Sequence, residues 1–359
     1  AAGRSSGRPR RGLQPPRGTL VLGVVAGMPA NAGLALRAHR QVGYAVSGVA
    51  TDLRLALIAA VMAARWRYFT TRPAGAIANA FTTEAERSSL AFLHGSLVVA
   101  AVIQILLYTA IAAAISWKAT VATLMLGAAS VWGLGWILNA GRRAGQRQTD
   151  LLKSSVAHLG DALHAIKPLR AMARERLMDN VLTRETEGLN RALRGEVLSK
   201  EGLKALQEPI LVIGLAAGLF AAVTYFSLPM SVLLMFGVLF GRTLGAIAKA
   251  QKEVQYFMIR ESAYASLVDT IAETEAERES LSGGVTPTLN KAITLSNVWL
   301  RYSGEPVLDT VSLRVPAGKL TTFVGPSGSG KTSLADIIVG LVSPDSGTVE
   351  IDDLDLTTI

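Results

Sequence analysis

Cysteine is absent from this sequence of 359 residues, and histidine is scarce. Without cysteine the chain has no disulfides, no thiol nucleophiles and no zinc sites with thiolate ligands. The four histidines, His39, His94, His158 and His164, do not show metal-ligand spacing, because ligand pairs typically lie about two to five residues apart. The sequence therefore predicts neither thiol chemistry nor a histidine metal site.

Charged residues are also scarce. Only 18% of the residues are charged, 50% are apolar, and the mean hydropathy is +0.35. A composition this apolar predicts a polytopic membrane protein. The net charge of +9 would normally indicate nucleic acid as a partner. We expect no nucleic acid here, because the positive charges gather in the segments between apolar runs, as membrane topology requires.

Long uncharged runs predict where the chain crosses the membrane. Two runs on either side of Lys118 are each longer than the roughly 20 residues that a helix needs to span a bilayer, and they predict spans at about 90–116 and 119–140. A third run covers 209–241 and is interrupted by Ser-Leu-Pro at 227–229. It predicts two further spans, at about 207–227 and 229–249.

The distribution of Lys and Arg predicts the orientation of these spans. The segment 139–208 carries 13 basic residues and the stretch 37–87 carries seven arginines, so both are expected in the cytoplasm. A weaker apolar segment at about 19–36 predicts one more span. That crossing would place the basic tail 1–18, which is expected to be disordered, outside the cell. Because this violates the positive-inside rule, we expect a preceding helix that the sequence lacks.

A glycine-rich motif stands at 325–332, where GPSGSGKT fits GxxxxGK[ST] between a predicted strand at 320–325 and a predicted helix at 332–341. Glycines at 325, 328 and 330 allow the backbone N–H groups to surround a phosphate. Lys331 supplies charge for the β- and γ-phosphates, and the Thr332 hydroxyl is a ligand for Mg²⁺. The predicted ATP-binding residues of this motif are Gly325, Pro326, Ser327, Gly328, Ser329, Gly330, Lys331, Thr332 and Ser333.

Alternating apolar residues begin at 291, after a predicted linker at 281–290, and indicate strands at 292–303 and 311–316. Tyr302 lies in the first of these strands, 23 residues before Gly325. From spacing alone, this tyrosine either packs against its neighbours or stacks on adenine.

The run from Ile293 to Ile359 resembles the opening of the nucleotide-binding domain of an ABC transporter. A membrane domain before it in one chain is the order of the exporter half-transporters. The resemblance implies an α-helical polytopic membrane domain of the ABC exporter type-1 fold over 19–280, with its first helix missing. This domain is followed by the N-terminal part of an α/β P-loop nucleotide-binding domain over 291–359. The resemblance also implies coupling helices near 72–87 and 172–180, and adenine stacking by Tyr302.

Such a protein would export a substrate with ATP and Mg²⁺ as cofactors. It would pair with a second half-transporter, homologous or identical, in the bilayer of the cell inner (plasma) membrane, with its nucleotide-binding domain in the cytoplasm. The family's Q-loop glutamine, LSGGQ signature, Walker B acids and switch histidine follow the Walker A helix and are absent from this sequence. No catalytic residue is therefore predicted, and ATPase activity is expected of a longer parent protein. The LSGG at 281–284 precedes the phosphate loop and is interpreted as coincidence.

Two questions stay open at this level. The first is whether the protein is an ATP-driven exporter half or, alternatively, a subunit of a heterodimer that binds nucleotide without hydrolysing it. Arg242, about 13 residues into the last span, either faces a cavity and contacts an anionic or polar substrate, or extends to the cytoplasmic headgroups near Lys249 and Lys252. The substrate is not predicted, although spans rich in Ala, Leu, Gly and Val would suit a lipidic or hydrophobic one.

Overall fold

A computed structural model describes residues 17–224, 230–279, 287–302 and 304–356. The chain divides into two compact units, 1–49 and 50–359, and each is considered by itself. The break predicted at 227–229, the LSGG at 281–284 and most of the basic tail and the linker lie outside the described residues.

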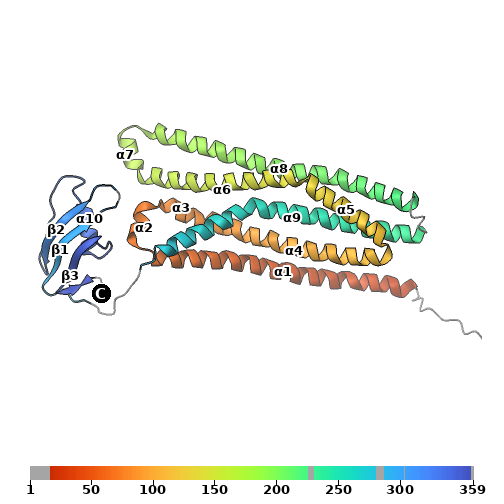
Figure 1. The fold of residues 1–359 in the computed structure, drawn as a ribbon, viewed down its shortest axis with the longest axis horizontal. Helices are drawn as coiled ribbons and strands as arrows, with labels where there is room; N and C mark the ends of the chain where they lie inside the picture. The colour runs from red at the N-terminus through yellow and green to blue at the C-terminus, as the bar shows by residue number, and fades with distance from the viewer. Residues whose placement is uncertain (1–16, 225–229, 280–286, 303, 357–359) are drawn as a thin grey trace, which may run out of the picture. The chain divides into compact units, whose positions relative to one another are not determined.

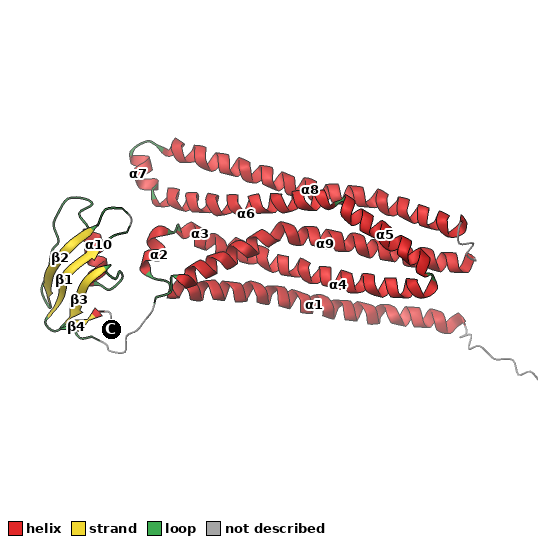
Figure 2. Ribbon diagram, in the orientation of Figure 1, coloured by secondary structure: helices red, strands yellow, loops and turns green. Residues whose placement is uncertain are grey.

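Helices make up the described part of the chain as far as residue 276 (Figure 2). The first helix, α1, begins in the first unit and ends in the second. Such long helices follow from the composition, because a chain in lipid must satisfy its backbone hydrogen bonds internally. Their bounds are α1 Arg17–Ala63, α2 Trp66–Thr71, α3 Ala74–Asn79, the π-helix η1 Ala80–Glu84, α4 Ala85–Ile115, α5 Trp117–Gly133, α6 Gly135–His164, α7 Ile166–Ala171, α8 Glu175–Thr224 and α9 Met230–Ala276.

Two helical stretches among the described residues are long and apolar enough to cross a membrane, namely 32–63 and 75–115. The predicted span at 90–116 coincides with most of the second. Residues 37–63 were expected on the cytoplasmic side, yet they belong to the first. A third crossing is possible if α5 and α6 form one span, although they meet at an angle of 41°. This bend lies at Leu134, which two glycines flank, so the run predicted as one span at 119–140 is two helical pieces.

Short helices occur at the turns where coupling helices were expected. The stretch 72–87 contains α3, η1 and the start of α4, with α2 immediately before it. At the other turn the short helix α7 ends at Ala171, just ahead of the expected stretch 172–180, which is occupied by a turn and the first residues of α8. Whether these helices dock on a nucleotide-binding domain stays a prediction.

Glycine permits the helices of the second unit to approach each other closely. A Cβ at Gly145 of α6 would lie 2.1 Å from the carbonyl oxygen of Ile259 in α9. A Cβ at Gly75 of α3 would likewise lie 2.5 Å from the carbonyl oxygen of Val156 in α6. Polar bonds accompany the first crossing, since the Ser262 hydroxyl donates to the Gly145 carbonyl at 3.1 Å. Figure 1 shows α6 running beside α8, with α7 at the turn between them.

The C-terminal part of the second unit contains a four-stranded antiparallel sheet with the order β2-β1-β3-β4. Its elements are β1 Ala292–Leu300, β2 Leu308–Pro316, the helix α10 Lys331–Ile338, β3 Ser346–Ile351 and β4 Leu354–Asp355. The predicted strands at 292–303 and 311–316 correspond to β1 and β2. Buried Leu295, Val298, Leu334 and Ile337 join the sheet to α10 in one apolar core.

The strand predicted at 320–325 is wrong for this structure, because that segment has no regular secondary structure. A strand needs hydrogen-bonding neighbours, and no described strand pairs with it. Leu320 and Val324 accordingly leave 96% and 90% of their surface exposed, whereas Phe323 packs on the core. Only Phe323 of this apolar segment thus joins the core, and apolar composition alone does not secure the hydrogen bonds of a strand.

Candidate phosphate-binding loop

The loop between Phe323 and α10 has the backbone that its glycines predict. Gly328 and Gly330 have φ values of +82° and +83°, a region that side-chain-bearing residues rarely adopt. Gly330 is also sterically enclosed, because a Cβ there would lie 2.8 Å from the Val307 carbonyl oxygen and 2.9 Å from Leu308 Cδ2. A side chain at position 330 would therefore disturb both the turn and the start of β2.

Lys331 folds its side chain back over this loop. Its Nζ donates to the carbonyl oxygens of Gly325 at 3.0 Å and Pro326 at 2.7 Å, and lies 3.4 Å from Ser329 Oγ. An ammonium group offers three hydrogen-bond donors, and all three point to this one loop. The positive charge is thereby held in the ring of backbone that the motif forms.

The first turn of α10 follows directly. The Leu334 N–H donates to the Gly330 carbonyl at 2.8 Å, which closes the first helical turn. Thr332 is exposed, and within the described part of the chain its hydroxyl has no hydrogen-bond partner. Ser333 is half-buried. Pro326, Ser327 and Ser329 are exposed on the loop, so the structure brings the nine predicted loop residues together in one continuous surface segment.

Tyr302 lies beyond the end of β1 and packs on the same apolar core as Leu334 of α10. In the second unit its ring also lies beneath Arg67, with 5.9 Å between the guanidinium carbon and the ring centroid. Arg67 Nη2 donates to the Tyr302 carbonyl oxygen at 3.2 Å. The structure therefore gives Tyr302 a packing role and leaves adenine stacking as a separate prediction.

Arg242 is remote from the loop in sequence and lies on α9, where its side chain is exposed. Neighbouring Thr243 and Leu244 are buried, so α9 turns its other face to the bundle at this level. Among the described residues Arg242 has no ion pair or hydrogen bond. Its contact with a substrate and its extension to the headgroups both stay predictions.

Sequence reasoning missed a polar cluster at the crossing of α4, α6 and α9. Arg87 Nη1 donates to Thr149 Oγ1 at 3.1 Å, and Thr149 Oγ1 lies 2.8 Å from Ser262 Oγ. Arg87 Nη2 additionally donates to the carbonyl oxygen of Ile259 at 3.4 Å. These residues are far apart in the sequence, and no local pattern joins them. The one available signal was an arginine next to an uncharged run.

Similarity to known proteins agrees with this architecture. Residues 16–247 match the pattern of the ABC transporter transmembrane region, and residues 308–359 match that of the ABC transporter. The heterocyst differentiation ATP-binding protein HepA of Nostoc is 24% identical over 299 residues, which are 82% of this chain and 49% of HepA. The alpha-hemolysin translocation ATP-binding protein HlyB of Escherichia coli is 28% identical over 205 residues, covering 55% of this chain and 28% of HlyB.

A solved structure shares the fold. A bacterial Atm1-family ABC exporter with ATP bound superposes with a TM-score of 0.76 at 17% identity, covering 97% of this chain and 63% of the exporter. The chain spans about half the length of its relative HepA. The match to the ABC transporter transmembrane region indicates that the chain is a multi-pass membrane protein with a cytoplasmic nucleotide-binding domain. The chain belongs to the ABC transporter family, and its transmembrane region precedes the nucleotide-binding domain.

Proposed function

We propose that the protein serves ATP-driven export and that the loop 325–333 holds the phosphates of ATP. The observation that carries this proposal is the position of Lys331, whose Nζ is surrounded by two loop carbonyls and a serine hydroxyl. Phosphate oxygens would replace these acceptors, and the N–H groups of the loop and of the first turn of α10 would surround them.

Thr332 is the residue that would hold Mg²⁺. Its hydroxyl is exposed at the start of α10, one position after the lysine, which fits a ligand that joins the metal to bound phosphates. The ion would neutralise charge on the β- and γ-phosphates. Ser333 is half-buried beside it and would add a phosphate contact from the same helical turn.

Tyr302 would stack on adenine if Arg67 leaves its ring. The cation over the ring is worth about 0.5–1 kcal/mol at an exposed site, so a base could displace it at small cost. In this proposal Tyr302 keeps one edge on the apolar core and offers a face to the nucleotide.

The wider function follows from the family. We propose that the chain pairs with a second half-transporter in the inner (plasma) membrane and moves a substrate outward. The described helices expose many large apolar side chains, such as Ile103, Leu106 and Leu107 on α4, which suits a surface in contact with lipid or with a second subunit. A hydrophobic or lipidic substrate is compatible with spans of this composition, and Arg242 on α9 is proposed as a contact for its polar or anionic part.

Nucleotide binding tests the proposal directly. The chain, purified in detergent, is titrated with radiolabelled ATP in the presence and absence of Mg²⁺, and Lys331→Ala is compared with Lys319→Ala, a matched change outside the loop. We expect Lys331→Ala to weaken binding at least tenfold and Lys319→Ala to leave it unchanged. Equal affinity of both variants and the unchanged chain would refute the assignment.

Hydrolysis is expected only of the longer parent protein, so measuring it there, with the same loop variants, separates the two readings of the family. Release of phosphate that Lys331→Ala abolishes supports an active exporter half. Binding of ATP without phosphate release supports the alternative, a nucleotide-binding subunit whose partner carries out hydrolysis. Thr332→Ala should reduce only the affinity gained by adding Mg²⁺, because it removes the proposed ligand to the ion.

A further inference from the structure

A groove of about 1030 Å³ runs between α6 and α8, away from the phosphate loop. The two helices are antiparallel here, as three contacts show. Ser199 Oγ donates to the Ile137 carbonyl at 2.9 Å, a Cβ at Gly195 would lie 3.6 Å from Ala144 Cβ, and one at Gly188 would lie 3.4 Å from Leu151. Small residues form the floor of the groove, and therefore few side chains fill the space above it.

The groove is strongly cationic at one end. Arg143 and Arg147 lie one turn apart on α6, and the register above places Arg191 of α8 at the level of Arg147. All three are exposed, and none has an ion pair or hydrogen bond within the described part of the chain. By contrast Arg142, the neighbour of Arg143, lies outside the groove and pairs with Glu261 at 3.4 Å. Three guanidinium groups thus line one groove with no acceptor among the described residues.

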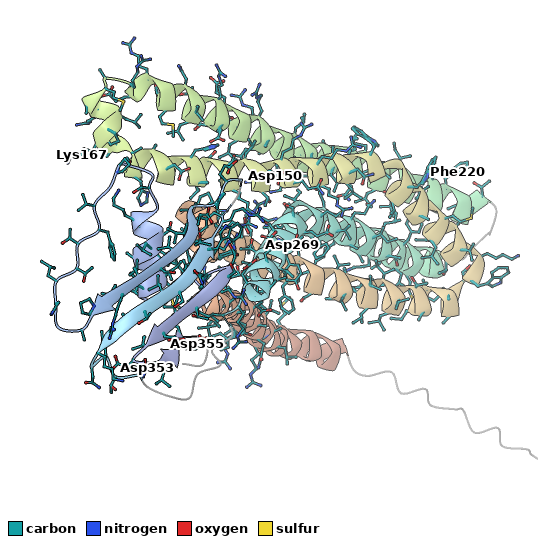
Figure 3. All side chains as sticks on the ribbon, turned by 60° about the vertical axis from the view of Figure 1, so that its left-hand side comes forward. Asp150, Lys167, Phe220, Asp269, Asp353 and Asp355 are labelled. Atoms are coloured by element: carbon teal, nitrogen blue, oxygen red, sulfur yellow. The ribbon has the colours of Figure 1, made fainter. Side chains whose placement is uncertain are left out.

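One acidic side chain also lines the groove. Asp150, labelled in Figure 3, lies on α6 one turn beyond Arg147. It leaves an excess of two positive charges among the lining residues. Arginine is well suited to phosphate, because its planar donors bind two oxygens at once.

The other end of the groove is apolar and lies where the membrane is expected to end. Trp136, Ile137, Leu198 and Leu206 line it. Trp136 is 66% exposed, as is usual for an aromatic residue at the membrane–water interface. Arg143 follows seven residues later, about 10 Å along the helix at 1.5 Å per residue. The headgroup layer is about 5–8 Å thick on each side of the bilayer, so the Arg143 backbone lies just beyond it, and the side chain, which leans toward the N-terminus of α6, reaches back into it.

We propose that this groove binds an anionic phospholipid of the cytoplasmic leaflet. The lipid phosphate contacts Arg143, Arg147 and Arg191. The parts of the acyl chains nearest the headgroup lie along Ile137, Leu198 and Leu206. Basic pockets between membrane helices on the cytoplasmic side recognise such headgroups. The proposal depends on the expected orientation of the chain in the membrane but not on nucleotide binding, and it adds a ligand site to the exporter fold.

Native mass spectrometry of the purified chain in detergent tests the proposal without nucleotide. Cardiolipin and phosphatidylcholine are titrated separately, and retained lipid is counted. The variant Arg143→Gln/Arg147→Gln/Arg191→Gln is compared with Arg170→Gln/Arg174→Gln/Arg176→Gln, which removes the same charge from exposed positions outside the groove. We expect the groove variant to lose about tenfold to a hundredfold in cardiolipin affinity and the control to lose less than threefold.

A second variant separates lipid binding from net charge. A Cβ at Gly202 meets nothing within 4 Å, and Gly202 lines the apolar end of the groove, so Gly202→Phe should fill that end without disturbing the helices. We expect it to reduce cardiolipin retention at least fivefold with a melting temperature that does not fall.

Three outcomes would overturn the proposal. The first is equal retention of cardiolipin and phosphatidylcholine by the unchanged chain. The second is equal loss in the two triple variants, which would indicate attraction to the whole basic surface. The third is a groove variant that changes the mass of the assembly while keeping its lipid, because the groove would then be an interface between copies of the chain.

Discussion

Gly145→Ala is expected to force α6 away from α9. The added Cβ would lie 2.1 Å from the carbonyl oxygen of Ile259, 2.8 Å from its carbonyl carbon and 2.9 Å from its Cα. All three atoms belong to helix backbone and cannot rotate away. Ordinary contact between such atoms lies at about 3.5 Å, so the helices must separate by about 1 Å or more.

The cost of that separation can be estimated. Overpacking of a well-packed contact costs about 1–3 kcal/mol. Hydrogen bonds at this crossing add to it, because the Ser262 hydroxyl donates to the Gly145 carbonyl at 3.1 Å and Arg87 to the Ile259 carbonyl at 3.4 Å. Alanine recovers about 1 kcal/mol of helix propensity relative to glycine. We therefore expect a net loss of about 2 kcal/mol in the free energy of unfolding.

Gly245→Ala is the matched control. Gly245 lies within α9, and a Cβ there meets nothing within 4 Å, so only the helix propensity changes. Thermal unfolding in detergent is followed by intrinsic fluorescence. With about 2–4 °C per kcal/mol for domains of about 150–250 residues, Gly145→Ala should melt about 4 °C or more below the unchanged chain, and Gly245→Ala should not melt lower. A Gly145→Ala variant that melts at or above the unchanged chain would refute the close crossing.

Three further predictions concern single sites. Thr149→Val, which removes the acceptor of Arg87 Nη1 and the hydroxyl 2.8 Å from Ser262 Oγ, should destabilise the protein by about 1–3 kcal/mol in the same assay, whereas Thr149→Ser should cost less. Gly330→Ala should weaken ATP binding at least tenfold, because the φ of +83° and the Val307 carbonyl both oppose a side chain; binding at full strength would contradict this. The pKa of the Asp352 carboxyl lies below its usual value, because backbone N–H groups donate hydrogen bonds to it. The largest effect comes from the N–H of Asn290, and those of Ala292 and Lys291 add to it. The contribution of Asp352 to stability is therefore present above about pH 4, the pKa in the unfolded chain, and is lost as pH falls through the lower folded pKa. Hydrogen exchange of β1 between pH 6 and 3 should show this loss in the unchanged chain and a shallower pH dependence in Asp352→Asn.

The sequence by itself determined the features that depend on local pattern or composition. Uncharged runs predicted long apolar helices, because a span needs only a sufficient length without charge. The motif GPSGSGKT predicted a phosphate loop, and the structure places the required left-handed conformations at Gly328 and Gly330, with Lys331 bonded to the loop. The resemblance of these two parts, in this order, to the ABC exporter half-transporters implied the fold class, which the family match and the solved exporter confirm.

Tertiary structure decided the features that depend on neighbours far along the chain. The segment 320–325 is apolar enough for a strand, yet it has no regular structure because no described strand lies beside it. Nothing near Gly145 in the sequence indicates that Ile259 lies against it, or that Arg143 and Arg191 line one groove. Local pattern fixes what a residue can do with its own backbone and side chain. Which distant residue it meets depends on how the helices pack, and that is set by the shapes of all the surfaces in contact together.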